Sequence, residues 1–263
     1  MKKSLCALSL CLSFSAFADQ PQFSNLSKDD VKDVSREFGA NFSHTAVSAP
    51  ETDGVWGIEI GALAGQTDSP NFADVIEDSG GEGSDFKKVY HAGVMARAHF
   101  PFELFAELTY LPEQDISDVK VKSNSFGVGW NVGSFVGLPL DIAVGLDYGK
   151  GEVDFHQDAD IPTLTPESDI NLKTTTTNYW VGVSKTFMFF TPYAKIGMSK
   201  IKGELDATGS IFTNVATTKE TVDLSGGFLA IGANLQFLFV KLGIEGSQIQ
   251  DTRRVTAKLS FDF

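Results

Sequence analysis

The sequence predicts an all-β protein, a transmembrane antiparallel up-and-down β-barrel of about ten strands with a short N-terminal helix. Three observations predict this fold. Apolar and polar residues alternate with a period of two from Val55 onward, which is the period of side chains on a β-strand. The last such strand, Val255 to Phe263, ends on an aromatic residue. No run of about 18 apolar residues follows the N-terminal leader, which argues against a spanning helix.

Composition agrees with this fold and argues against other classes. The chain has 263 residues, of which 42% are hydrophobic, and a formal net charge of -13. Such acidity argues against nucleic acid as a partner, because phosphate binding needs a basic surface. The mean hydropathy of -0.03 is too low for a helical membrane protein. A membrane barrel has such a value, because half of its strand residues point inward.

The N-terminus has the pattern of a secretory signal peptide. A basic pair opens the chain, Leu5 to Phe14 form an apolar stretch, and Ala16 and Ala18 provide the small residues of a cleavage site. We therefore predict a leader over residues 1–18. Such a leader directs the chain into the secretory pathway and is removed from the mature protein.

Both cysteines lie inside this leader, at Cys6 and Cys11. Cys11 is not expected to be a lipoprotein site, because it follows a large residue within the apolar stretch. We therefore expect the mature protein to contain no thiol, no disulfide and no cysteine metal site.

A short helix is predicted over Ser27 to Ala40. Ser27 is a suitable N-cap, Asp29 and Asp30 would lie in the first turn, and Gly39 would weaken the end. We predict a periplasmic helix and linker over residues 19–54. A plain surface helix, a plug of the barrel and a periplasmic contact are the alternatives.

The first four predicted strands each show one apolar face. A ten-residue strand has the length needed to cross a bilayer at a tilt. The apolar faces are Trp56 to Ala64, Tyr90 to Phe100, Leu104 to Tyr110 and Phe126 to Val132, read at every second residue. A polar segment, Gln66 to Asp85, separates the first two, Pro101-Phe102 turns the second into the third, and a short polar loop precedes the fourth.

Six further strands follow with the same alternation. They are predicted at Leu140 to Gly149, around Tyr179 to Val183, at Pro192 to Lys200, at Val222 to Leu235, around Val240 to Glu245 and at Val255 to Phe263. Long polar loops are predicted at Lys150 to Leu172 and Ile201 to Lys219. The phase of the alternation changes near Gly226-Gly227, which predicts a β-bulge. The last strand is expected to close the barrel against Trp56 to Ala64.

An even strand count lets both chain ends lie on one side of a closed barrel. The long polar segments alternate with short turns, which is the asymmetry of extracellular loops and periplasmic turns. Aromatic residues separate in the same way and predict two interfacial girdles. Tyr90, Tyr110, Tyr148 and Tyr179 fall at the long-loop ends, and Trp56, Phe100, Trp130 and Phe263 fall at the short-turn ends.

The last strand resembles the closing strand of Gram-negative outer-membrane β-barrels, in which alternating apolar residues and a terminal Phe form the signal read by the barrel-assembly machinery. That resemblance assigns the assembly signal to Val255, Leu259, Phe261 and Phe263. The chain as a whole resembles a family of uncharacterised Gram-negative outer-membrane barrel proteins of unknown function. The resemblance covers the helix, Asn41-Phe42-Ser43-His44-Thr45-Ala46-Val47-Ser48, the strand Trp56 to Gly65 and Tyr110-Leu111-Pro112. It implies no defined activity.

The predicted lumen-facing positions are rich in glycine and carry charges of both signs. A ten-stranded interior is only slightly wider than one that side chains can fill. We weigh a blocked, salt-bridged interior against a narrow polar pore and against a cavity that the segment Ser27 to Ala40 occupies. The candidate lumen network is Glu59, Arg97, Glu107, Asp141, Asp147, Lys195, Lys241, Glu245 and Lys258.

Patterns suggestive of chemistry are weak. The glycines between Gly127 and Gly133 lack the spacing and the helix of a dinucleotide fingerprint. His91 and His99 are eight residues apart on one strand face, too far to share a metal. His44 is expected to be solvated in the linker.

An acidic cluster, Asp154 to Asp160 with His156, is predicted in the loop above the fifth strand. Its Asp154-x-His156 pair is similar to the Asp-x-His pair of ten-stranded omptin proteases. Omptins take their acidic pair and their Asp-x-His pair from different strands, whereas here Asp158-x-Asp160 lies in the same loop as Asp154 and His156. Cation binding and a solvated acidic loop are the alternatives.

We therefore predict an integral outer-membrane barrel over residues 55–263 with periplasmic termini, no catalytic residue, no cofactor and no metal. Its partners would be outer-membrane lipid and lipopolysaccharide, and the barrel-assembly machinery during biogenesis. A structural or surface role and a narrow passive pore are the two main functions. Transport of a small or hydrophobic solute with the N-terminal segment as plug is the alternative, and an omptin-like rim protease is the distant one.

Overall fold

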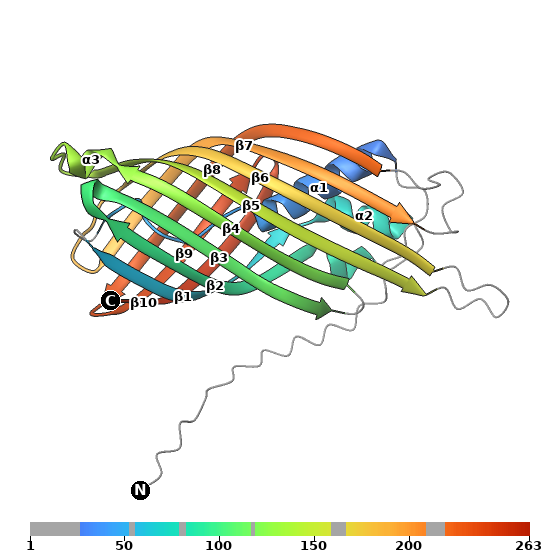
Figure 1. Ribbon diagram of the computed structural model, residues 1–263, viewed down its shortest axis with the longest axis horizontal. Helices are drawn as coiled ribbons and strands as arrows, with labels where there is room; N and C mark the ends of the chain where they lie inside the picture. Colours follow the sequence, from blue (N-terminus) through green and yellow to red (C-terminus); the bar gives the residue numbers. More distant parts are fainter. Residues whose placement is uncertain (1–26, 53–55, 79–82, 117–118, 159–166, 209–218) are drawn as a thin grey trace, which may run out of the picture.

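The computed structural model describes residues 27–52, 56–78, 83–116, 119–158, 167–208 and 219–263. Ten antiparallel strands form a closed barrel in which each strand pairs with its neighbours in the chain and β10 pairs with β1 (Figure 1). The strands are β1 Gly57–Asp68, β2 Lys88–Phe100, β3 Leu104–Ile116, β4 Val119–Asn131, β5 Asp141–Asp158, β6 Glu167–Ser184, β7 Phe190–Thr208, β8 Lys219–Phe237, β9 Val240–Ile249 and β10 Thr252–Asp262. The helical elements are α1 Lys28–Phe42, α2 Pro70–Asp78, η1 Gly83–Phe86, η2 Pro101–Glu103 and α3 Val132–Phe135.

The fold class and the closing pair are confirmed. In the register of β1 and β10, Ala62 lies opposite Leu259 and Ala64 lies opposite Ala257. Around the closed part of the barrel each strand is paired on both sides, which a membrane-spanning sheet requires. Lys219 to Gly226 of β8 extend beyond the pairing with β9. The predicted leader and its cleavage site lie outside the described residues.

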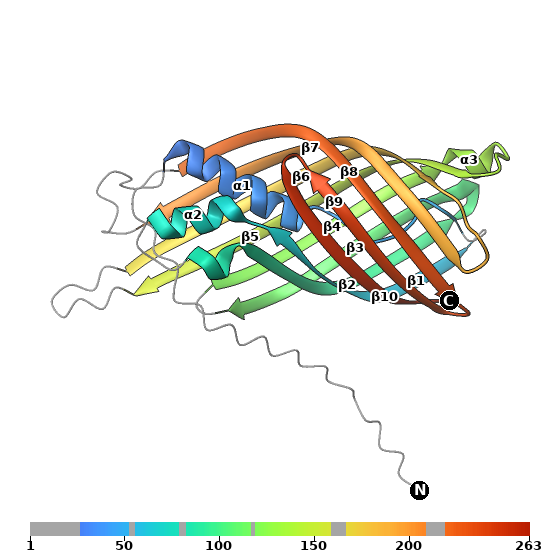
Figure 2. The ribbon, with the colours of Figure 1, turned by 180° about the vertical axis from the view of Figure 1, so that it is seen from behind.

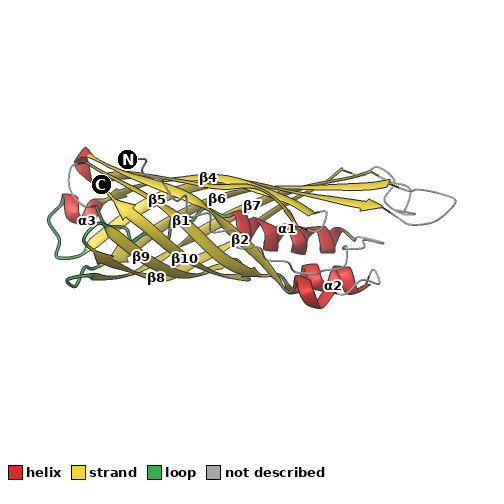
Figure 3. Cartoon of the chain, turned by 90° about the horizontal axis from the view of Figure 1, so that it is seen from below, coloured by secondary structure: helices red, strands yellow, loops and turns green. Residues whose placement is uncertain are grey.

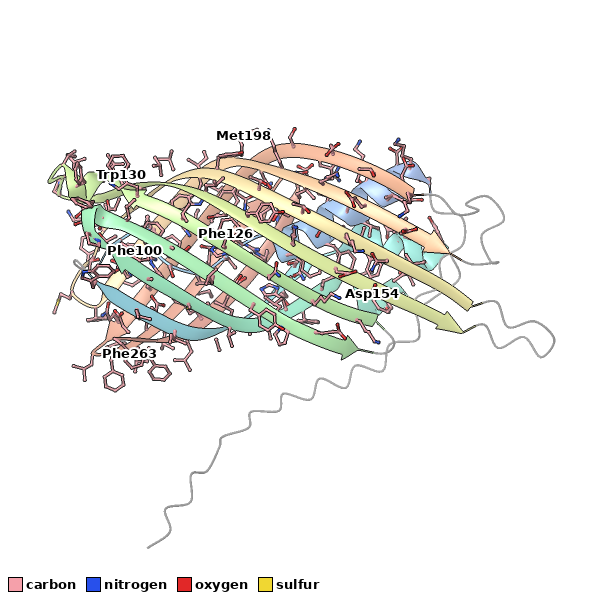
Figure 4. The ribbon with its side chains drawn as sticks, in the orientation of Figure 1. Phe100, Phe126, Trp130, Asp154, Met198 and Phe263 are labelled. Carbon is pink, nitrogen blue, oxygen red and sulfur yellow. The ribbon has the colours of Figure 1, made fainter. Side chains whose placement is uncertain are left out.

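The two ends of the barrel differ. At the long-loop end lie the β1–β2, β5–β6 and β7–β8 connections, and at the short-turn end lie the β2–β3, β6–β7 and β8–β9 turns together with Phe263 (Figures 1 and 2). Between them the outer wall is apolar and exposed, as at Ile60, Leu108 and Ile196. Phe100, Trp130 and Phe263 gather at the short-turn end in Figure 4. No helix in the described part of the chain is long and apolar enough to cross a membrane.

Strands β5, β6 and β7 continue well beyond the predicted boundaries, whereas β8 exceeds its predicted range by only a few residues. β5 to β8 are 18 or 19 residues long, so much of the predicted loops at 150–172 and 201–219 is strand. The alternation is inverted in these extensions. Their inward residues are apolar and belong to one buried cluster with α1, and their outward residues are polar. The inward residues of this cluster are Val153, Ile170, Leu172, Leu205 and Val222.

The predicted β-bulge at Gly226-Gly227 is wrong. The pairing of β7 with β8 runs without a register shift through Ser199↔Gly226 and Met198↔Gly227. The change of phase has another cause. Leu229 and Ile231 face outward, where the wall is apolar, whereas Val222 and Leu224 are buried in the interior toward the long-loop end. The irregular register lies between Leu111 and Gln114 in the pairing of β3 with β4.

The connections follow the predicted asymmetry only in part. The segment predicted as polar, 66–85, contains the end of β1, α2 and part of η1. The β9–β10 connection is a tight turn at Gln250, and the β4–β5 connection contains α3. β9 and β10 are shorter than β7 and β8. Figure 2 shows that they end earlier at the long-loop end, so that α1 is visible beside them.

Candidate functional site in the barrel lumen

The N-terminal part of the chain fills the barrel. The plug segment, Lys28–Thr52, consists of α1 and an extended stretch that leads toward β1. Every residue from Glu37 to Glu51 is buried, and α1 packs against at least eight of the ten strands. Figure 3 shows α1 inside the barrel toward the long-loop end. The helix and linker thus lie within the barrel, which agrees with the plug alternative, and not beyond its end in the periplasm as the predicted domain boundaries implied.

The start of α1 is built as the sequence predicted. The Ser27 hydroxyl accepts from the Asp30 backbone N–H at 3.2 Å, and the Asp30 carboxylate accepts from the Ser27 N–H at 2.8 Å. The helix does not weaken at Gly39 but continues to Phe42. Gly39 instead allows close approach to the wall, because a Cβ there would overlap Ile201 of β7.

Arg97 of β2 holds the extended half of the plug segment by its backbone. Its Nη1 donates to the carbonyl oxygen of Ala49 at 2.8 Å, and its Nη2 donates to that of Glu51 at 2.6 Å. Glu107 balances its charge at 3.2 Å, and the guanidinium lies 4.4 Å from the ring centroid of Phe105. Arg97 and Glu107 are both buried. Loss of either would leave an uncompensated charge, which is strongly destabilising.

His44 of the plug segment lies against β3 and β4. Its Nδ1 is 2.8 Å from the Ser125 hydroxyl and its Nε2 is 3.3 Å from the Glu107 carboxylate. The side chain is 2% exposed. The prediction of a solvated His44 is therefore wrong, because the linker that carries it passes through the lumen.

Arg254 of β10 caps the end of the plug helix. Its Nη1 donates to the carbonyl oxygens of Ala40 at 3.1 Å and Ser43 at 2.5 Å, and its Nε donates to the Ser247 hydroxyl at 3.2 Å. The last carbonyls of a helix have no partner within the helix and carry partial negative charge. A buried guanidinium supplies both the donors and the opposite charge.

Glu245 of β9 collects donors from the plug and the wall. Its carboxylate accepts from the Thr45 hydroxyl at 2.9 Å, from the Tyr193 hydroxyl at 3.0 Å and from the Lys195 ammonium at 3.4 Å. Arg254 lies 4.0 Å away. The carboxylate thus joins the plug segment to strands β7, β9 and β10.

A third cluster lies nearer the short-turn end. Lys258 donates to the Ser48 hydroxyl at 2.9 Å and to the Glu59 carboxylate at 2.6 Å. Ser260 donates to the same carboxylate at 2.6 Å. Lys241 pairs with Asp262 at 2.9 Å. Buried charges here are again satisfied by each other and by the plug segment.

The structure brings most of the predicted lumen residues together. Asp147 is buried and accepts from the indole N–H of Trp180 at 2.9 Å. Asp141 stands apart, near the short-turn end, where it accepts from Asn131 at 2.6 Å. The members in buried ion pairs are Glu59, Arg97, Glu107, Lys195, Lys241, Glu245 and Lys258.

Sequence reasoning missed Arg254 and the whole extended half of the plug segment. Arg254 could have been found, because it continues the inward alternation of Thr256 and Lys258 by one more step. The partners of the lumen charges could not have been found from the sequence. They are mostly backbone carbonyls and hydroxyls of residues 40–51, which have no distinctive pattern.

Glycines on the inner face provide the space for the plug segment. A Cβ at Gly151 would overlap the ring of Phe42, one at Gly203 would overlap Ser35, and one at Gly127 would lie 2.8 Å from His44 Nε2. The predicted abundance of inward glycines therefore has a physical role here. They accommodate a segment of the chain and do not leave an open channel at these positions.

Glu37 of α1 binds the start of α2, which lies across the long-loop end. Its carboxylate accepts from the Asn71 and Phe72 backbone N–H groups at 2.8 and 2.9 Å and from the Asn71 amide at 2.8 Å. The N-terminus of a helix favours an anion. Burial nevertheless dominates and raises the pKa of Glu37 from 4.5 to about 7.

This pKa predicts that the packing of α1 against α2 weakens as pH rises. The folded state holds the proton more tightly than the unfolded state, so the free energy of unfolding should fall between about pH 4.5 and 7 and stay low above it, by at most about 3 kcal/mol. Urea unfolding in detergent micelles at pH 5 and pH 8 measures the effect. Glu37→Gln is the control that should lose this part of the pH dependence, and an unchanged pH dependence in that variant would contradict the assignment.

The acidic cluster near Asp154 is not a loop in its described part. Asp154 lies within β5, toward the long-loop end (Figure 4), and its carboxylate accepts from the Asn171 amide of β6. In the pairing of these strands, His156 lies opposite Asp169. The described residues contain no group of three or more histidine, cysteine or acidic side chains that could hold a metal. Asp160 lies outside the described residues.

A groove of about 590 Å³ lies near the long-loop end of β3 to β7. Lys122, Glu152 and Lys173 are among its lining residues. Glu152 pairs with Lys122 at 3.0 Å and with Lys173 at 3.4 Å. Opposite charges therefore neutralise one another there, on a face that is polar and accessible.

Comparison with known proteins assigns the chain to a family. Residues 1–263 match a family of unknown function, DUF6588. The chain belongs to this family. The predicted resemblance to an uncharacterised barrel family is confirmed, and the fold of this DUF6588 protein is a closed ten-stranded antiparallel β-barrel. No curated protein matches it.

Three solved structures illustrate the likeness in fold. Ail, the attachment invasion locus protein of Yersinia pestis, is 12% identical, with 79% of this chain and 97% of that chain covered and a TM-score of 0.33. The translocator domain of the autotransporter NalP from Neisseria meningitidis is 12% identical, with 89% and 93% covered and a TM-score of 0.41. Neisserial surface protein A is 10% identical, with 79% and 95% covered and a TM-score of 0.31. These likenesses concern architecture and assign no function to the DUF6588 chain.

Proposed function

We propose that this protein is a non-catalytic outer-membrane barrel that its own plug segment seals, and that it presents the extensions of β5 to β8 at the cell surface in a structural or surface-interaction role. The observation that carries the proposal is the unbroken burial of Glu37 to Glu51 inside the barrel. A permanently open pore would need lumen charges that face water. Here Arg97 and Lys258 instead bind the plug segment.

The short-turn end faces the periplasm in this proposal. Short turns and Phe263 lie there, and the long strands lie at the other end, as in barrels whose long loops are extracellular. The outer wall would contact lipid and lipopolysaccharide. The barrel-assembly machinery would read the outward side chains of the closing strand, Val255, Leu259, Phe261 and Phe263.

A plug-gated transporter of a small or hydrophobic solute is the second candidate. The two halves of the plug segment are held differently, and this favours it. α1 packs through apolar side chains such as Val34 and Phe38, whereas the stretch from Ser43 to Glu51 is held largely by hydrogen bonds. Such hydrogen bonds exchange with water, so each contributes only about 1.5–3 kcal/mol on net, the range for bonds to charged groups. The extended half could therefore detach while α1 stays in place.

Conductance in planar bilayers tests the seal. The full-length barrel should pass no steady current, and a variant without residues 19–52 should conduct because a central strand-lined space is emptied. Heat-modifiable gel migration shows whether the shortened barrel has folded. A synthetic peptide of residues 27–52, added to the folded variant, should reduce the current.

Steady conductance of the full-length protein would overturn the seal, and so would a folded shortened variant that does not conduct. Transient current in the full-length protein on addition of a solute would favour the plug-gated transporter. If the shortened chain does not fold, single-cysteine labelling at Ala46 of the full chain takes its place. A sealed barrel leaves that buried position unreactive toward a membrane-impermeant maleimide.

A further inference from the structure

The turns at the short-turn end are apolar at their tips. Phe102, Met188 and Leu238 are 74%, 92% and 88% exposed, and they lie in the β2–β3, β6–β7 and β8–β9 connections. Turns that face water are dominated by Gly, Asn, Asp, Ser and Pro. These tips therefore lack the composition of a turn that projects into the periplasm.

The backbone makes this composition more unusual. Phe102, Met188 and Leu238 have φ values of 66°, 58° and 55°. This left-handed region suits Gly and Asn, and a bulky residue there costs about 1–2 kcal/mol. Turn geometry thus does not explain the large apolar side chains. Their environment must favour them by more than the strain disfavours them.

Apolar groups lie on opposite sides of this end and are not confined to one side. Rings from neighbouring turns and strands stack on each other, as Phe189 does with Phe237 at 5.4 Å between ring centroids. Phe239 stacks with Phe261 at 6.4 Å. On the far side, the rings of Trp130 and Phe135 meet edge to face at 5.6 Å. A protein partner would cover one sector, whereas a lipid leaflet covers a complete ring.

The height of the apolar outer wall also indicates that lipid surrounds the turns. Along β7 the outward residues are apolar from Phe190 until Lys200, a separation of ten residues. At about 3.3 Å per residue and a strand tilt of about 40°, this separation spans about 25 Å along the barrel axis. The apolar band of outer-membrane barrels is about 25 Å tall. The lower boundary of the band therefore falls at the turn itself.

We propose that the β2–β3, β6–β7 and β8–β9 turns are immersed in the lipid leaflet, with Phe102, Met188 and Leu238 inserted at the boundary between headgroups and acyl chains. The occupant of this apolar ring is lipid, because the ring is continuous with the lipid-facing wall. The turns act as anchors that fix the depth of the barrel in the membrane. This inference goes beyond the proposed seal and does not depend on it.

Depth-dependent fluorescence quenching tests the immersion. Met188→Cys and Leu238→Cys are made in a Cys6→Ala, Cys11→Ala background, labelled with a small environment-sensitive fluorophore and reconstituted in vesicles. Brominated lipids should quench both labels strongly, and aqueous iodide should quench them weakly. Thr221→Cys, an exposed position of β8 toward the long-loop end, is the matched control with the opposite response.

Iodide quenching at positions 188 and 238 as strong as at position 221 would overturn the proposal, because the tips would then lie in water. The same labels in isolated outer membranes separate lipid from a protein partner. Protection from iodide that appears only in native membranes, without bromolipid quenching in vesicles, would assign the ring to a protein partner and would also overturn it. Folding of each variant is checked by heat-modifiable migration.

Discussion

Replacing Arg254 with methionine should lower the free energy of unfolding by about 3–5 kcal/mol. Among the described residues, Arg254 is the largest of the fully buried side chains. Its removal would leave the carbonyl oxygens of Ala40 and Ser43 without their donor and would take a positive charge from beside Glu245. Unsatisfied buried acceptors and unbalanced charge are both destabilising. The end of the plug helix should loosen first.

Arg253→Met is the matched control. Arg253 is the neighbouring residue of β10 with the same side chain, but it is exposed on the outer face, so its replacement should change stability by less than about 0.5 kcal/mol. Urea unfolding in micelles gives the two values, and limited proteolysis reports release of the plug segment. Equal stability of the two variants would show that Arg254 does not secure the plug.

Gly151→Leu should displace the plug segment from the wall. A side chain at Gly151 would occupy the position of the Phe42 ring, so either Phe42 moves or β5 bends. Overpacking of a buried site costs about 1–3 kcal/mol. Because the barrel wall is held by two full strand pairings, we expect the plug segment to yield. The variant should conduct in planar bilayers where the parent is closed.

Gly227→Leu is the control for a leucine in a strand. Gly227 is an exposed residue of β8, and a Cβ there meets no atom within 4 Å. This variant should remain closed and should keep Ala46→Cys unreactive, whereas Gly151→Leu should make that cysteine accessible. A closed Gly151→Leu barrel with an unreactive cysteine would contradict the role of Gly151 in making room for the plug.

The lipid-facing half of the structure was predictable from sequence. Bilayer contact requires an apolar face, and because side chains alternate along a strand, that face appears as an apolar residue at every second position. The ten strands, the pairing of β1 with β10 and the outward aromatic residues follow from this pattern alone. The start of α1 was also predictable, because the capping pair of Ser27 and Asp30 is local.

The parts of β5 to β8 at the long-loop end were not predictable, because their apolar side chains contact α1 and not lipid. There the apolar residues point inward to α1 and the outward ones are polar. Where the apolar residues of a strand change from the outward to the inward positions, a pattern that expects apolar outward residues indicates a polar loop or a bulge instead. The loops predicted at 150–172 and 201–219 and the bulge at Gly226-Gly227 fail for this one reason.

The sequence by itself determined the barrel, its number of strands and the charges on their inner faces. Only the tertiary structure decided what those charges meet. A lumen-facing Arg254 has the same alternation whether it faces water or the carbonyl oxygen of Ser43, which is 211 residues away in the chain. Contacts between such distant segments leave no periodic signal in either of them. The contacts between the plug segment and the strands therefore become apparent only in the closed barrel, which brings them together.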